Sequence, residues 1–332
     1  MAKLKDYSDE QLRLAARLYY VDGLGQREVA RLAKVSQAKV SRLLAAARER
    51  GIVHISVAEY KPHNKKLEHA LRREFGFRTV AVIKTPPGAT DDDARRAVGY
   101  FGASVVAGLL PRKAVVAIAG GRTIRDLVRH LAEDPARRLE VVQAMGNIDS
   151  HVGSEDALEL GRVLARRSGG SFVTLNSPAF VSDRKTRDAF LALPPIRSVH
   201  QRLAEAQVAL VGVGTLDNSV FAARGVLTPR DIAELDACGA VGEICGRFFD
   251  RNGQECDSPW RDRVVSISLE QLRRIPRVIG IVAGGDRSVA IAAAARGGLL
   301  KALVTEEKLG QFLFAAARAS ISPASESLSP GV

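Results

Sequence analysis

One short segment of the chain combines glycines, a cation and a hydroxyl in an order suited to holding an anion. Gly120 and Gly121 are followed directly by Arg122 and Thr123. Two glycines let the backbone approach a ligand closely, arginine offers a fork of donors, and threonine can cap a helix or bind an oxygen. An apolar run precedes the segment and a helical pattern follows it. A strand end that leads into a helix N-terminus favours phosphate.

Two further glycine turns follow apolar runs. Gly284, Gly285, Asp286 and Arg287 form one, and the segment 212–215 (Gly-Val-Gly-Thr) forms the other. The second is a weak match to a dinucleotide-binding motif, because no third glycine follows at the required spacing. Each turn alone could be a tight structural loop. Ligands in parallel α/β sheets bind at the carboxyl ends of strands, so three such turns predict a shared anion pocket.

A different pattern occupies residues 26–50, QREVARLAKVSQAKVSRLLAAARER. It predicts two helices joined by a tight turn, which is typical of a helix-turn-helix. Ala30 is small enough for close helix approach, Val35 fills the turn, and Ser36 is a suitable N-cap for the second helix. A generic helical hairpin with a solvated charged face is the alternative.

The outward face of this segment carries side chains suited to DNA. Seven basic residues and only two acidic ones lie between Arg27 and Arg50, an excess that favours phosphate contacts. Arginine suits guanine, glutamine suits adenine, and lysine and serine contact phosphates. The predicted DNA-binding residues are Arg27, Lys34, Ser36, Gln37, Lys39, Ser41 and Arg42.

The periodicity of apolar residues predicts the elements that position these groups. The first sixty residues should form helices at 8–22, 26–33 and 36–50 and then a strand at 52–57, with a linker at 61–64. Beyond the linker, short apolar strands alternate with amphipathic helices, which indicates an α/β domain with a mostly parallel sheet covered by helices. We expect strands at 79–83, 115–119, 141–145, 172–175, 207–213, 278–283 and 302–304, helices at 65–75, 91–110, 123–133, 155–167, 183–193 and 286–296, and another from residue 228. A strand within 240–249 should enter an Asn-Gly hairpin turn at 252–253.

Composition restricts the class of protein. The chain has 332 residues and a net charge of +12, and only 5% of its residues are aromatic. This length suits two domains, and the charge favours a polyanionic partner, although an arginine-rich soluble protein without such a partner would look similar. Few aromatics disfavour recognition of single-stranded nucleic acid by stacking.

The sequence offers no pattern for a metal, a disulfide framework or a membrane segment. The three cysteines are Cys238, Cys245 and Cys256, and the six histidines are scattered without ligand spacing. An odd number of cysteines suits a reducing cytoplasm. The N-terminus is polar, and no apolar run is long enough to span a bilayer. We therefore expect a cytoplasmic protein that needs no cofactor and no metal.

The segment 29–55, VARLAKVSQAKVSRLLAAARERGIVHI, resembles the DNA-binding segment of the SorC (sugar-binding) family of bacterial transcriptional regulators. Gln37 and Lys39 stand where arginine and threonine are common in that family, so a different operator specificity is expected. The resemblance continues in order through GGRTIRDLV, VVQAMGNI, NSPAFVSD, VGVGTL, GEICGRFFD and the segment 278–307. Nearly the whole chain is covered.

The resemblance implies a sugar-phosphate isomerase-like, Rossmann-type domain used as an effector sensor. Gly121, Arg122 and Thr123 would hold a phosphate, and Arg287 would add a charge where the family often has lysine. Asp250 would accept hydrogen bonds from sugar hydroxyls. Together with the glycine turns, the predicted effector-binding residues are Gly120, Gly121, Arg122, Thr123, Gly146, Asn147, Gly214, Asp250, Gly284 and Arg287.

These observations predict a DNA-binding transcriptional regulator of a carbohydrate or polyol operon, controlled by a sugar phosphate or related polyol. Repression is the expected sign of control, although an activator could share every residue named. We expect a helix-turn-helix (winged-helix-like) domain at 1–58, an effector-binding and oligomerisation domain at 59–318, and a disordered tail at 319–332. The protein should be a dimer or tetramer, associated with the nucleoid when bound to DNA. The alternatives are a sugar-phosphate isomerase or deaminase with an accessory DNA-binding domain, and an architectural DNA-binding protein.

Overall fold

The computed structural model describes residues 7–58 and 60–319. The chain divides into two compact units, Met1–Lys61 and Pro62–Val332, so the boundary lies three residues beyond the predicted one. The predicted tail begins inside a helix that reaches Ala319, and residues 320–332 lie outside the described part. No helix in the described part of the chain is long and apolar enough to cross a membrane.

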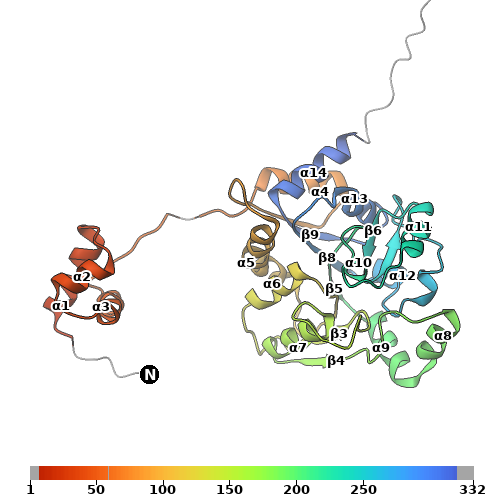
Figure 1. Ribbon diagram of the computed structural model, residues 1–332, viewed down its shortest axis with the longest axis horizontal. Helices are drawn as coiled ribbons and strands as arrows, with labels where there is room; N and C mark the ends of the chain where they lie inside the picture. Colours follow the sequence, from red (N-terminus) through yellow and green to blue (C-terminus); the bar gives the residue numbers. More distant parts are fainter. Residues whose placement is uncertain (1–6, 59, 320–332) are drawn as a thin grey trace, which may run out of the picture. The chain divides into compact units, whose positions relative to one another are not determined.

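The first unit is helical. It contains α1 (Asp9–Ala16), a π-helical turn (Arg17–Val21), α2 (Gln26–Leu32) and α3 (Gln37–Glu49) (Figure 1). Its core consists of small and branched apolar side chains, Leu12, Ala15, Ala16, Val29, Ala30, Val40, Leu43, Leu44, Ala46 and Ala47. The Ser36 hydroxyl accepts a hydrogen bond from the backbone N–H of Lys39 and so caps α3 as predicted.

The strand predicted at 52–57 is absent. Ile52 and Val53 pack against the helical core, but Ile55 and Val57 are 56% and 82% exposed. A strand needs a partner for its backbone groups, and the described part of this unit contains no second strand. The alternation of apolar residues was therefore a misleading signal here.

The second unit is built on one parallel sheet of seven strands in the order β1-β9-β8-β5-β2-β3-β4. The strands are β1 (Thr79–Ile83), β2 (Val115–Ile118), β3 (Glu140–Gln143), β4 (Ser171–Val173), β5 (Val208–Val211), β8 (Arg277–Val282) and β9 (Ala302–Glu306). Central strands such as β2 and β5 are buried along their whole length. Continuous apolar runs are expected for a sheet covered on both faces.

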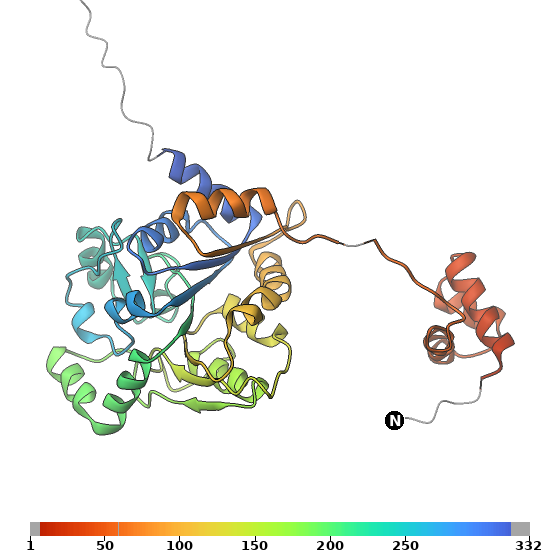
Figure 2. The ribbon, with the colours of Figure 1, turned by 180° about the vertical axis from the view of Figure 1, so that it is seen from behind.

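Helices cover both faces of the sheet. The helices are α4 (Lys65–Phe75), α5 (Asp91–Leu109), α6 (Arg122–His130), α7 (Ala157–Arg167), α8 (Arg184–Ala192), α9 (Pro194–Ala204), α10 (Val220–Ala223), α11 (Pro229–Ala237), α12 (Leu269–Arg274), α13 (Ser288–Arg296) and α14 (Glu307–Ala319), with a 3-10 turn at Arg261–Arg263. Helices α4 and α14, from opposite ends of this unit's sequence, lie side by side (Figure 2). The sequence analysis did not predict α9, α10, α12 or α14.

The path of the chain through the sheet decides which face each helix covers. From β1 to β4 the chain moves along the sheet in one direction, and from β4 to β9 it returns in the other. Because crossovers between parallel strands are right-handed, α5, α6 and α7 cover one face, and α9, α12 and α13 cover the other. Strands β2 and β5 are neighbours whose following connections leave in opposite directions. A crevice opens at such a point at the carboxyl edge of the sheet.

A small antiparallel hairpin lies outside the main sheet. It pairs β6 (Gly242–Ile244) with β7 (Arg247–Phe249) through a two-residue turn at Cys245 and Gly246, which have φ of 54° and 78°. Positive φ at both central residues is the type I′ geometry. The Asn-Gly turn at 252–253 was predicted as the hairpin turn, but it follows β7 and leads to a single bridge between Phe249 and Glu255.

Candidate functional site

A cavity of about 400 Å³ opens where β2 and β5 diverge. Its walls come from the loops that follow β2, β3, β5 and β8, from the hairpin, and from α5 and α10. The predicted effector-binding residues that it brings together are Gly120, Gly121, Arg122, Thr123, Gly146, Asn147, Gly214 and Arg287. The sheet topology therefore joins three turns that are far apart in the sequence.

The Gly120–Gly121 turn places the N-terminus of α6 at the cavity. Gly121 has a φ of 146°, a conformation that side chains disfavour, and its N–H donates to the carbonyl of Glu155 at 2.8 Å. A Cβ on Gly120 would lie 2.9 Å from that same carbonyl oxygen. The turn is thus held against the segment that precedes α7. The first residues of α6 line the cavity, and the amide groups at a helix N-terminus favour an anion.

Two arginines at the cavity lack a carboxylate partner. Among the described residues, neither Arg122 nor Arg287 forms an ion pair, and the only hydrogen bond of the Arg287 guanidinium goes to the carbonyl of Ala283 at 3.5 Å. Arg287 is 8% exposed, and its pKa is lowered by burial and by the positive charge of Arg122. A third arginine, Arg95 of α5, also lines the cavity and pairs with Asp92. Arg122 is exposed, whereas Arg287 is buried, and a buried cation without an ion-pair partner favours a bound anion.

Arg224 lines the cavity as well, but it is already neutralised. Its guanidinium donates to Asp149 at 3.0 Å and to Asp156 at 2.5 Å. Asp156 also accepts the N–H of Gly153. This ion-pair group was missed in the sequence because its members come from two distant segments, the loop between β3 and α7 and the end of α10, that share no motif.

Glu243 of β6 is a buried carboxyl group on the cavity wall. Its backbone exchanges two hydrogen bonds with Gly214, of 2.9 and 3.0 Å, and its Oε1 accepts the N–H of Gly246 at 2.5 Å. Burial raises the pKa of Glu243 to about 7. A Cβ on Gly214 would lie 2.7 Å from the Glu243 carboxylate, so glycine is needed there for close packing. The residue belongs to the GEICGRFFD segment, but the sequence analysis selected Asp250 from it.

Two predicted effector residues lie outside the cavity. The carboxylate of Asp250 accepts the N–H groups of Asn252 and Gln254, both at 2.9 Å, and so it stabilises the turn after β7. Gly284 donates its N–H to Glu306 at 3.2 Å. Neither residue lines the cavity, so the structure does not bring Asp250 and Gly284 together with the other predicted effector residues.

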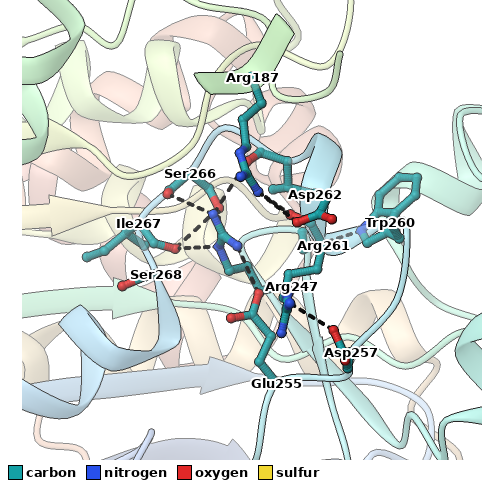
Figure 3. Close-up of polar contacts among 12 residues, drawn as sticks. Arg187, Arg247, Glu255, Asp257, Trp260, Arg261, Asp262, Ser266, Ile267 and Ser268 are labelled. Atoms are coloured by element: carbon teal, nitrogen blue, oxygen red, sulfur yellow. Dashed lines mark hydrogen bonds and ion pairs between the residues drawn. The ribbon is translucent and has the colours of Figure 1, made fainter. Parts of the chain in front are cut away.

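The hairpin that carries Glu243 is fastened by a buried arginine. Figure 3 shows Arg247 between Glu255 and the segment Ser266–Ile267. Its guanidinium donates to Glu255 at 2.8 Å, to the Ser266 hydroxyl at 3.2 Å and to the Ile267 carbonyl at 3.1 Å. The only tryptophan of the chain, Trp260, donates to the carbonyl of Gly246 at 2.8 Å. The hairpin is thus a rigid wall rather than a loose loop.

The first unit presents the predicted DNA-binding residues around α2 and α3. Lys39 is half-buried, and the others are exposed: Arg27, Lys34, Ser36, Gln37, Ser41 and Arg42. Among the described residues, none of the four cationic side chains in this set forms an ion pair. Arg42 donates to the carbonyl of Ala38 at 3.2 Å, one turn earlier in α3. Lys34 has a φ of 52° in the turn between the helices. The positive charge of this face is therefore available to a polyanion.

Comparisons with known proteins cover both units. Residues 61–315 match the family model described as "Putative sugar-binding domain". The chain is 30% identical over 315 residues to the uncharacterized transcriptional regulator YjhU of Escherichia coli K12, covering 93% of this chain and 95% of that protein. It is 28% identical over 305 residues to the sorbitol operon regulator of Klebsiella pneumoniae, covering 90% and 95%. The crystal structure of the full-length sorbitol operon regulator SorC from Klebsiella pneumoniae matches with a TM-score of 0.74 and 26% identity, over 93% of this chain and 100% of that one.

Proposed function

The chain belongs to the SorC family of transcriptional regulators with a sugar-binding domain, and on that premise we propose that it represses a carbohydrate or polyol operon in response to a phosphorylated sugar or polyol. It is a regulator and not an enzyme. DNA binding is assigned to α3 and its flanking turn, and effector binding to the cavity at the carboxyl edge of the sheet. A homo-oligomer would present two recognition helices to two half-sites of an operator.

The observation that carries the effector proposal is the pair of unneutralised arginines beside a helix N-terminus. Arg122 and Arg287 are close enough for the charge of one to lower the pKa of the other, and no described carboxylate pairs with either. A phosphate group would relieve this repulsion and accept N–H groups from the start of α6. A cavity of about 400 Å³ is within the range typical of small-molecule sites.

Thermal unfolding of the full chain with inorganic phosphate and a panel of free and phosphorylated sugars and polyols tests this proposal. A ligand at about 100 times its Kd should raise the free energy of unfolding by about 2.7 kcal/mol. We expect phosphorylated ligands to stabilise the large unit and Arg122→Ala to remove most of that effect. Arg129→Ala changes an exposed arginine at the far end of the same helix and should leave it intact. Equal stabilisation by free sugars and their phosphates would contradict the phosphate assignment.

The DNA-binding assignment predicts a specific salt dependence. Lys39→Ala removes one cation from the first turn of α3. If Lys39 contacts a DNA phosphate, affinity should fall for operator and random DNA alike, and the slope of log K against log salt should decrease by about 1. Fluorescence anisotropy at several salt concentrations measures both quantities. Lys185→Ala, which removes an exposed lysine from α8 of the other unit, is the control, and an equal loss in both variants would refute the assignment.

A further inference from the structure

More than half of the chain's net positive charge lies outside the first unit. Residues 1–61 contain 12 lysines and arginines against 7 acidic residues, and residues 62–332 contain 37 against 30. The large unit therefore carries +7 of the net charge of +12. Where its cations gather decides which partner this charge suits.

Three of these cations lie side by side at the amino edge of the sheet, opposite the edge that holds the cavity. The neighbouring strands β1, β9 and β8 begin directly after Arg78, directly after Lys301 and at Arg277. The N–H of Arg78 donates to the carbonyl of Lys301, and the N–H of Lys301 donates to that of Val278, both at 2.9 Å. Burial and the charge of Arg78 lower the pKa of Lys301. Since neighbouring strands are about 4.8 Å apart, the row spans about 10 Å.

The ends of two helices add arginines to the same corner. In a parallel α/β sheet each helix returns the chain to the amino edge, so its last turn lies near the start of the next strand. Arg72 and Arg73 are in the last turn of α4, which leads into β1, and Arg296 ends α13, which leads into β9. Helices α4 and α13 contact each other and α14 (Figure 1).

Five arginines of this corner are exposed, and none of them forms an ion pair with a described residue. We call them the amino-edge patch: Arg72, Arg73, Arg78, Arg277 and Arg296. The segments that carry the corner, 72–78, 273–277 and 296–301, contain one acidic residue, Glu74. The patch is therefore a concentrated positive surface.

Support of the fold accounts for only part of this charge. Arg273 and Lys301 donate to backbone carbonyls at the corner, and Arg274 is paired with Glu270. The C-terminus of a helix carries about half a negative charge, so the ends of α4, α12 and α13 together balance about one and a half cations. Most of the charge of the patch remains available to a partner.

The side chains of the patch suit the phosphate backbone of duplex DNA. Arginine binds phosphate oxygens through two parallel N–H groups. A protein partner or a membrane surface would favour apolar anchors, and no large apolar side chain of the three segments is exposed. Phe75 and Phe77 pack into the core, so neither can stack on an unpaired base.

The connection between the units keeps the patch within reach of DNA bound by the first unit. Val53 packs against the core of that unit, and the large unit begins at Pro62. The chain between them spans at most about 30 Å, and α4 adds about 16 Å. The patch can therefore lie no farther than about 45 Å from the first unit, the rise of about 13 base pairs.

We infer that the amino-edge patch is a second DNA-binding surface, which binds the phosphate backbone of the duplex beside the site held by α3. The inference rests on DNA binding by the first unit and adds a contact made by the effector-sensing unit itself. Contacts to phosphate carry no sequence information. The patch should therefore strengthen binding to operator and random DNA alike.

Fluorescence anisotropy of the full chain on a labelled random-sequence duplex of about 60 base pairs, at several salt concentrations, tests the inference. The variant Arg73→Gln with Arg277→Gln removes two exposed cations of the patch. Two lost phosphate contacts should lower the affinity at least five-fold at about 0.1 M salt and reduce the slope of log K against log salt by about 2. Arg73→Glu with Arg277→Glu should weaken binding further, because carboxylates repel phosphate.

A matched pair of substitutions controls for net charge. Lys185→Gln with Arg197→Gln removes the same charge from exposed positions of α8 and α9, where neither side chain forms an ion pair with a described residue. We expect this pair to leave the affinity and the salt slope unchanged. Urea unfolding and sedimentation of each variant without DNA should match those of the unmodified chain, because all four positions are exposed.

Each other result counts against the inference. An unchanged salt slope in the patch variants overturns it, and so does an equal loss in the control pair. A changed sedimentation coefficient of the patch variants would make the patch a contact between copies of the chain. Unchanged DNA affinity with loss of binding to anionic phospholipid vesicles would make it a membrane surface. If Lys39→Ala weakens DNA binding and the patch variants do not, only this inference fails, whereas a full chain that binds no DNA contradicts the proposed function as well.

Discussion

Replacing Gly146 by alanine is expected to destabilise the large unit by about 3 kcal/mol and to abolish effector binding. A Cβ at this position would lie 2.5 Å from the carbonyl carbon and oxygen of Pro178 and 2.6 Å from the carbonyl oxygen of Ser177. All three obstacles are backbone atoms, so no side-chain rotation relieves the clash. The two segments must separate, and Asn147, the next residue, must lose its place at the cavity.

Moving the backbone at Gly146 away from the segment 177–179 would break several hydrogen bonds. Its N–H donates to Val265 at 3.1 Å, and Asn147 exchanges hydrogen bonds with the segment 177–179. Chemical unfolding of Gly146→Ala measures the loss. Gly108→Ala is the matched control, because Gly108 lies within α5 and a Cβ there would meet no atom within 4 Å. Alanine at 108 should stabilise by up to about 1 kcal/mol. Similar free energies of unfolding for the two variants would contradict the prediction, because the backbone at Ser177 and Pro178 could then move away from a Cβ at position 146 at little cost.

The fold was largely predictable because its elements are marked by local patterns. Val115–Ile118 is a continuous apolar run, as a central parallel strand must be, and Ile124, Leu127 and Val128 repeat at the spacing of the buried helix face that follows. Caps such as Thr228 were equally visible and begin α11 as predicted. The strand predicted at 52–57 is absent because a local pattern was not sufficient there. Alternation describes one strand, but a strand forms only where a second one can pair with it.

The sequence predicted the lining of the cavity mainly where glycine-containing turns mark a close approach of the backbone. The turns at Gly120–Gly121 and Gly214 need glycine for backbone approach, and both lie at the cavity. Arg224 and Asp156 form their ion pair across 68 positions of the chain, a distance that no local pattern spans. The sequence analysis chose Asp250, whereas the cavity is lined by Glu243, and the reason is related. Both acids belong to one motif, but only the path of the hairpin decides that Glu243 faces the cavity and Asp250 caps a turn.

The buried carboxyl of Glu243 should make the stability of the large unit depend on pH in the direction opposite to acid denaturation. Burial raises its pKa from an ordinary value of 4.5 to about 7 in the folded protein. Between these values the folded state binds more protons than the unfolded state, so stability falls as pH rises. The contribution is fully present below about pH 4.5 and is lost as pH rises through 7. The loss should be about 3 kcal/mol.

Glu243→Gln isolates this effect from every other titrating group. Glutamine keeps an oxygen to accept the N–H of Gly246, but it carries no ionisable proton. The difference in unfolding free energy between the unmodified chain and Glu243→Gln, measured by urea unfolding from pH 5 to pH 8 without effector, should therefore shift by about 3 kcal/mol in favour of the variant. Glu133→Gln changes a carboxylate that is 73% exposed and should give a flat difference. A flat difference for Glu243→Gln too would mean that Glu243 ionises in the folded protein as it does in water, and that the hairpin wall admits solvent to the carboxylate.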